Sequence, residues 1–163
     1  MAKTYCIAGD LADWFVRRAD LESGDAMTHL KLQKLLYYAQ AWHLANYNRR
    51  LFDEDLKAWT HGPVVPSVWH KYRNFGWDII QPAKTAAKVA DATASFLENV
   101  YNIYGKYSGK ALEDLTHDEL PWKEARGDLP IQAKSTTPIS DKTMRDFYAS
   151  KINKTWPTSA ILK

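Results

Sequence analysis

The feature that most constrains the fold is the segment of residues 28–48, in which apolar side chains occupy almost the whole circumference of a helix. At helical spacing, Leu32, Leu35 and Trp42 share one face, and Leu44 lies on a second. A helix on a protein surface shows a single apolar stripe, whereas a helix that is apolar on several sides is buried. We therefore expect this helix to be the central element of the fold.

Apolar residues also recur every three or four positions in further segments, which predicts additional helices. The predicted helices cover residues 7–21, 65–75, 89–107, 111–115, 121–126 and 141–152. Gly24, Ser108-Gly109 and Gly127 are expected stop signals, and Ser140 is the expected N-cap of the last helix.

Residues 56–65 have no helical period, and His61-Gly62-Pro63 would interrupt any helix. We expect a short strand and a turn there, with a second short strand at Ile79-Ile80 pairing with it. The predicted fold is mainly α: one compact domain over residues 1–163, with about six or seven helices and a small two-stranded β element. Its expected core covers residues 5–152, followed by a loose tail over residues 156–163.

Composition narrows the class of protein. The 163 residues are 45% hydrophobic and 13% aromatic, which is too apolar for a disordered chain. The single cysteine, Cys6, cannot form an internal disulfide, and no run reaches the ~20 apolar residues that cross a bilayer. Asp10 and Asp13 within the first apolar run argue against a signal peptide. We expect a cytoplasmic protein with no membrane association.

The patterns typical of enzymes are absent from the sequence. The histidines lack metal-ligand spacing, and the chain has no nucleophile elbow and no glycine-rich phosphate loop. His117, Asp118 and Glu119 are adjacent, but neighbouring residues of a helix point in different directions, so we expect a helix cap and a packed histidine. The sequence thus predicts no catalysis, no metal and no cofactor.

Direct nucleic-acid binding is not expected either. The net charge of +3 arises from 22 basic and 19 acidic residues, so the balance is nearly even. Lys71 and Arg73 lie beside aromatic residues, as in single-strand binders. However, the spacing of Val68, Trp69 and Tyr72 turns these rings toward the core and leaves the two cations as an ordinary solvated face.

Three phrases, taken together, resemble a known family. They are LKLQKLLYYAQAWHLA at residues 30–45, KAWTHGPVVPSV at 57–68, and an S-G…L-T-H…P-W…A-R series between 108 and 126. Their order and content are similar to the Panacea domain of SocA-like antitoxins, which also occurs in phage-associated proteins. The resemblance covers roughly residues 5–152, nearly the whole chain.

The resemblance implies an antitoxin that neutralises a cognate toxin by direct protein contact. It leaves open a proteolysis adaptor that delivers the toxin to a Clp-type protease, and a phage-encoded regulator of a host protein. A weaker alternative, suggested by residues 117–119 alone, is an enzyme that reverses damage done by the toxin.

Within the resemblance, the most recognisable residues look like scaffold: the leucines of residues 30–45 as core, Gly62-Pro63 as turn, and Trp122 as an anchor for the late helices. The candidates for partner contact are the polar and amphipathic residues beside them. For each, capping or bracing the fold is the alternative role. These candidates are Gln33, Lys34, Tyr37, Tyr38, His61, Arg73, Trp77, His117 and Arg126.

Overall fold

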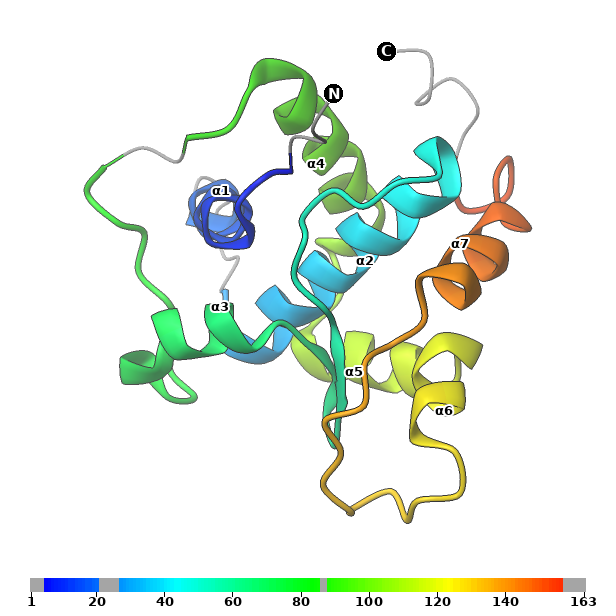
Figure 1. Cartoon of the computed structure of the whole chain (residues 1–163). Coiled ribbons are helices and arrows are strands. Elements are labelled where there is room, and N and C mark those ends of the chain that lie inside the picture. Colours follow the sequence, from blue (N-terminus) through cyan, green and yellow to red (C-terminus); the bar gives the residue numbers. More distant parts are fainter. Residues whose placement is uncertain (1–4, 21–26, 86–87, 157–163) are drawn as a thin grey trace.

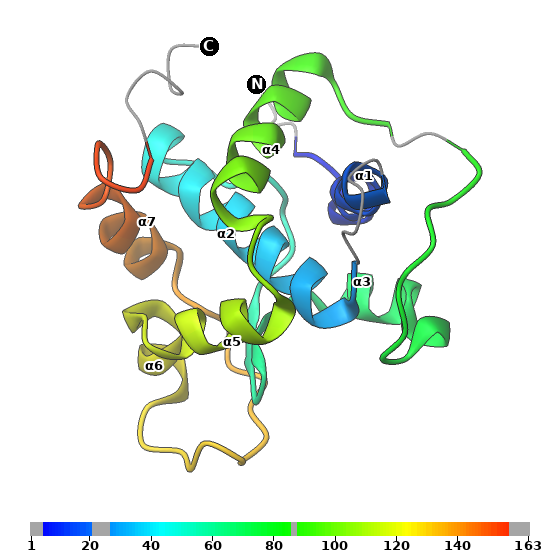
Figure 2. The same cartoon turned by 180° about the vertical axis from the view of Figure 1, so that it is seen from behind.

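Helix α2 (His29–Tyr47) lies at the centre of the molecule (Figures 1 and 2). The computed structural model describes residues 5–20, 27–85 and 88–156. Thr28 caps the start of α2 with its hydroxyl, and Asn48 ends the helix in the left-handed conformation, with φ 54°. Within residues 29–44 every side chain except that of Leu30 is buried. This burial confirms that the helix is the central element.

The other helices pack around α2 and on one another, which confirms a mainly α fold with the expected number of helices. Helices α1, α3, α4, α5 and α7 contact α2, whereas α6 packs on α5 and α7 (Figure 2). The described residues thus form seven α-helices and one 3-10 helix, and the elements besides α2 are α1 (Ala8–Asp20), α3 (Pro66–Lys71), η1 (Arg73–Phe75), α4 (Asp91–Tyr104), α5 (Gly109–His117), α6 (Leu120–Arg126) and α7 (Asp141–Ala149).

A two-stranded antiparallel sheet joins α2 to α3, as expected, but its partner strand is not the predicted one. β1 (Lys57–Trp59) pairs with β2 (Gly62–Val64) across a tight turn at residues 60–61. Ile79-Ile80 forms no strand; instead the buried Ile80 donates its amide to Met27 O, at 2.8 Å. The free edge of β1 is met by residues 137–139, which exchange backbone hydrogen bonds with residues 56–58.

A buried cluster of tyrosines holds α7 and α4 against α2. The rings of Tyr38 and Tyr104 stack with centroids 3.8 Å apart, and Tyr37 and Tyr148 lie 3.0 Å apart between their hydroxyl oxygens. The Tyr38 and Tyr148 hydroxyls both donate to Glu119 Oε1, each at 2.8 Å. Each hydroxyl thereby gains the partner that a buried polar group requires.

The hydrophobic core extends to Trp156, beyond the expected limit at residue 152. The Trp156 ring is buried and stacks on Trp42 with centroids 5.1 Å apart, and it also contacts Phe96. An indole of this size belongs to the core, so the prediction of a loose tail was wrong for Trp156. The remainder of that tail, residues 157–163, lies outside the described residues.

Several helix boundaries differ from the predicted ones. α4 ends at Tyr104, and Ser108 caps α5 instead of closing the preceding helix, because its hydroxyl accepts from Ala111 N. α7 ends at Ala149, before Ile152. The Ser140 cap is confirmed, whereas the predicted stop at Gly24 lies outside the described residues.

Gln40 fastens the chain that follows α2 to the buried helix itself. Its Oε1 accepts from Leu51 N at 2.7 Å and from Phe52 N at 3.3 Å, and its Nε2 donates to Phe52 O at 2.8 Å. One buried amide therefore satisfies three backbone groups of a segment whose other backbone pairing is a short bridge between Phe52 and Cys6.

We expect Gln40→Leu to lower the free energy of unfolding by about 3 kcal/mol, because buried backbone groups left without partners each cost on the order of 1–3 kcal/mol. Urea unfolding followed by circular dichroism measures the change. Gln81→Leu, at an exposed glutamine, is the control and should stay within about 0.5 kcal/mol of the wild type. Equal effects of the two substitutions would contradict this role for Gln40.

Candidate functional site

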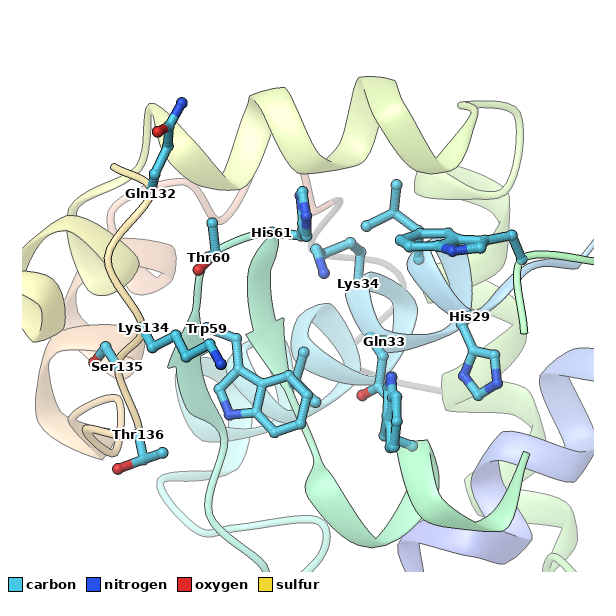
Figure 3. A pocket seen from close by; sticks show the side chains of 14 residues that line it. His29, Gln33, Lys34, Trp59, Thr60, His61, Gln132, Lys134, Ser135 and Thr136 are labelled. Atoms are coloured by element: carbon cyan, nitrogen blue, oxygen red, sulfur yellow. The ribbon is translucent and has the colours of Figure 1, made fainter. Parts of the chain in front are cut away.

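The described surface contains a cavity of about 530 Å³ between the first turns of α2, the β1–β2 turn, and residues 132–136 (Figure 3). Its walls include three indole rings, those of Trp59, Trp69 and Trp77. A volume of this size suits a peptide side chain or a small molecule, and aromatic walls with a few polar groups are typical of binding sites.

The polar floor of the cavity comes from α2. Gln33 Oε1 accepts from Val65 N at 2.8 Å, which ties the end of the hairpin to the helix. The next residue along the helix is Lys34, whose Nζ donates to Pro63 O at 3.2 Å. Figure 3 shows the Lys34 side chain extending from α2 toward the hairpin, with the His61 ring beyond its end.

Lys34 can lie under the hairpin because the hairpin residue that it contacts, Gly62, has no side chain. A Cβ at Gly62 would stand 2.5 Å from Lys34 Cε and 3.0 Å from Thr116 Oγ1, and the backbone there has φ 106°, which L residues rarely adopt. Glycine is therefore required twice, once for the turn and once for the close approach.

Burial makes Lys34 an unusual cation. The side chain is 1% exposed, and loss of hydration lowers its pKa from 10.5 to about 7, although the Glu113 carboxylate opposes that shift. Glu113 in turn has Lys110 Nζ at 3.1 Å and His61 Nδ1 at 3.2 Å. A cation held in this way gains strongly from any additional anion that reaches it, because the surroundings are poor in water.

The indoles differ in exposure. Trp77 is 81% exposed and Trp69 is 39% exposed, whereas Trp59 is half-buried. The Trp77 ring faces the edge of the His61 ring, with centroids 6.4 Å apart. The expectation that Trp69 turns into the core was wrong: α3 buries Val68, and Trp69 lines the cavity.

A family model described as "Antitoxin SocA-like, Panacea domain" matches residues 32–123, more than half of the chain. This chain belongs to the SocA-like Panacea-domain family. The matched region contains most of α2 and all of the hairpin, α3, α4 and α5, and so includes most of the residues that line the cavity. No curated protein and no solved structure matches the chain.

Several predicted contact residues of this Panacea domain are structural. Tyr37 and Tyr38 are 0% exposed inside the tyrosine cluster, so they cannot meet a partner in this conformation. Arg126 is also buried, and its guanidinium donates to Ala58 O, at 3.1 Å, and to backbone oxygens of residues 130–133. Burial of these side chains corrects the prediction, because the sequence pattern placed them beside the core faces and not within them.

The structure brings four of the predicted residues together at the cavity. Gln33 and Lys34 are buried at its floor, and His61 and Trp77 lie exposed at its rim. Arg73 is exposed in the 3-10 helix η1 but does not line the cavity.

Residues 117–119 do not form a reactive cluster. His117 stacks on the Trp122 ring with centroids 4.0 Å apart, and burial lowers the pKa of His117. Glu119 turns the other way, into the tyrosine cluster. The predicted packed histidine is therefore confirmed, but Glu119 makes no side-chain cap. Within the described residues, no three His, Cys, Asp or Glu side chains lie close enough to hold a metal, and no helix is long and apolar enough to cross a membrane.

Sequence reasoning missed His29, Trp59 and Trp69, and the loop of residues 132–136, as parts of the site. The tryptophans stand in short segments next to a turn, where no long helix can bury them, and that context was the available signal. The loop has no signal of its own, because its place depends on bonds to distant residues such as that from Thr60 Oγ1 to Ala133 O.

We expect Gly62→Ala to lower the free energy of unfolding by about 2–3 kcal/mol, because the new methyl group overlaps Lys34 and the backbone is strained. Gly76→Ala is the matched control: Gly76 also has a positive φ, 56°, but nothing lies within 4 Å of the added carbon. The control carries backbone strain without the overlap, so it should lower the free energy of unfolding by less than Gly62→Ala does. Chemical unfolding of both variants measures the difference, and equal costs would argue against a close approach at Gly62.

The Glu119 carboxyl should make stability depend on pH. Burial raises its pKa from 4.5 to about 7, although hydrogen bonds from Tyr148 and Tyr38 oppose the rise. The folded state therefore favours the protonated acid. The contribution of Glu119 to the free energy of unfolding is full below pH 4.5 and is lost as the pH rises through about 7.

Glu119→Gln keeps the shape of the side chain and both accepted hydrogen bonds. As the pH rises from 4.5 to 8, we expect the free energy of unfolding of this variant to increase relative to that of the wild type by about 2–3 kcal/mol. Unfolding free energies of both proteins across this range test it. Glu54→Gln, at an exposed carboxylate, controls for the amide substitution. A constant difference between Glu119→Gln and the wild type would contradict the raised pKa.

Proposed function

We propose that this chain is an antitoxin that neutralises a cognate toxin by direct protein contact, and that the toxin docks at the cavity walled by Trp59, Trp69 and Trp77. The observation that carries the proposal is the exposed indole of Trp77 at the rim of that cavity, in a chain of the antitoxin family. Tryptophan is enriched among the residues that dominate binding energies at protein interfaces.

The character of the site supports binding and not catalysis. Lys34 lies at the floor of the cavity, under a hairpin that is itself fixed to α2. A rigid aromatic surface of this kind loses little conformational entropy when a partner docks. The proposed activity is accordingly recognition of the toxin, with no chemical step performed by this chain.

We expect co-expression with the product of the adjacent gene to restore growth and to yield a complex that co-purifies. Trp77→Ala should weaken that complex by about tenfold or more, because loss of an interface tryptophan commonly costs over 1 kcal/mol. Ile7→Ala, at an exposed apolar residue that does not line the cavity, is the matched control and should bind as the wild type does. Affinities by calorimetry and growth curves give the two readouts.

Absence of both growth rescue and a complex would overturn the proposal. The toxin's half-life in the cell separates inhibition from delivery to a protease. A half-life that is unchanged while growth is restored supports direct neutralisation, whereas a shortened half-life supports an adaptor that hands the toxin to a Clp-type protease.

A further inference from the structure

The cavity beside α2 has an unbalanced set of charges. The ammonium groups of Lys34 and Lys134 line it together with the imidazole rings of His29 and His61, and no carboxylate does among the described residues. The nearest acid, Glu113, is not part of the lining and is already engaged by Lys110 and His61. The cavity therefore complements an acidic group in electrostatic terms.

Lys34 has hydrogen-bonding capacity to spare. An ammonium group carries three donors, and Pro63 O is the acceptor that the described residues provide within hydrogen-bonding distance. Polar groups this deeply buried normally find partners for most of their donors. A carboxylate entering the cavity would supply the missing acceptor and a second counter-charge besides that of Glu113.

His29 provides a hydrogen-bond acceptor in the same cavity, whereas Lys34 provides donors. Its Nε2 lies 2.5 Å from Tyr72 O, and a carbonyl oxygen can only accept, so Nε2 carries the hydrogen. In the neutral ring Nδ1 is then an acceptor, and this atom is buried without a partner. His29 is 7% exposed, so bulk water does not readily satisfy it. A backbone N–H group is a donor of the kind that this atom lacks.

A ligand that fits all three features must carry an anionic acceptor, an N–H donor and apolar surface for the indoles. A free carboxylate or phosphate has the first and lacks the other two. A polypeptide segment with an acidic side chain between large apolar ones has all of them.

From this juxtaposition of Lys34, His29 and three tryptophans, we infer that the cavity binds an extended segment of the partner in which an acidic side chain, flanked by aromatic ones, reaches Lys34. The inference rests on the proposed function for the identity of the partner, a toxin, but the binding chemistry stands on the cavity itself. In this arrangement the flanking rings pack on Trp59, Trp69 and Trp77, and a peptide N–H meets His29 Nδ1.

The test uses synthetic peptides, so it does not depend on knowing the toxin. The probe is acetyl-Gly-Phe-Glu-Phe-Gly-amide, the matched control is the same peptide with Gln in place of Glu, and acetate is the third ligand. Indole N–H resonances of the full chain report on the cavity in ¹H–¹⁵N spectra. We expect the Glu peptide to shift the signals of Trp59, Trp69 and Trp77 with a Kd of about 1 mM or tighter, and the Gln peptide to bind about tenfold more weakly.

Variants then connect the effect to Lys34. Lys34→Met keeps the side-chain length and should remove the preference for Glu over Gln, whereas Lys123→Met, at an exposed lysine on α6, should keep it. Should Lys34→Met fail to fold, Lys134→Met at the exposed rim should reduce the preference about twofold to threefold, as expected for an exposed charge. A preference that survives both lysine substitutions would overturn the inference.

Three further results would overturn the inference: no shift of the cavity indoles, equal affinity for the Glu and Gln peptides, or acetate shifting the same indoles as strongly as the peptide. These failures are distinguishable from failure of the antitoxin proposal. A toxin complex that depends on Trp77 but shows no peptide selectivity leaves the antitoxin function standing and removes the acidic segment. Peptide selectivity without a toxin complex leaves the binding of an acidic segment standing and removes the antitoxin function.

Discussion

The structure depends on the burial of α2 on nearly all sides, because every polar side chain of that helix must then find a partner inside the protein. A buried polar group without a hydrogen bond costs free energy comparable to a lost bond. Gln33 meets this demand at Val65, Gln40 at Phe52, and Lys31 at Gly105. These bonds reach backbone groups in the segments that connect the helices and strands, so the central helix organises the connections as well as the core.

The same constraint explains the tyrosine cluster. A ring with a hydroxyl can be buried only where the oxygen has a partner, and Glu119 provides one acceptor for two hydroxyls. A carboxyl buried for this purpose holds its proton more tightly, as its raised pKa shows. Hydrogen bonds from Tyr38 and Tyr148 to Glu119 thus attach α7 and the start of α6 to α2 within an aromatic core.

The cavity is the place where the demand of α2 for partners is incompletely met. Among the residues that the structure describes, Lys34 has one acceptor and His29 has a ring nitrogen without a partner, and both line the cavity with three indoles. Hydrogen-bonding groups without protein partners, set within an aromatic surface, suit a recognition site, because a ligand can form the hydrogen bonds that the fold leaves unmade. The residues of the family's recognisable phrases therefore divide into those that complete the scaffold, such as Tyr38 and Arg126, and those that border the site, such as Lys34 and His61.

The sequence by itself determined the mainly α fold, the central helix, the Ser140 cap, the family, and the interruption of helix at residues 61–63, although Gly62 and Pro63 lie in β2 and the turn itself is at residues 60–61. Each follows from local chemistry: apolar spacing, glycine and proline geometry, and a hydroxyl before a helix. Periodicity shows which faces are apolar, but it does not show which neighbour covers them. For that reason only the tertiary structure could decide that β1 pairs with β2 and not with Ile79-Ile80, and that Tyr37 and Tyr38 are buried. It also decided that Trp69 faces a cavity, because long-range bonds such as that of Lys34 to Pro63 set where separate segments meet.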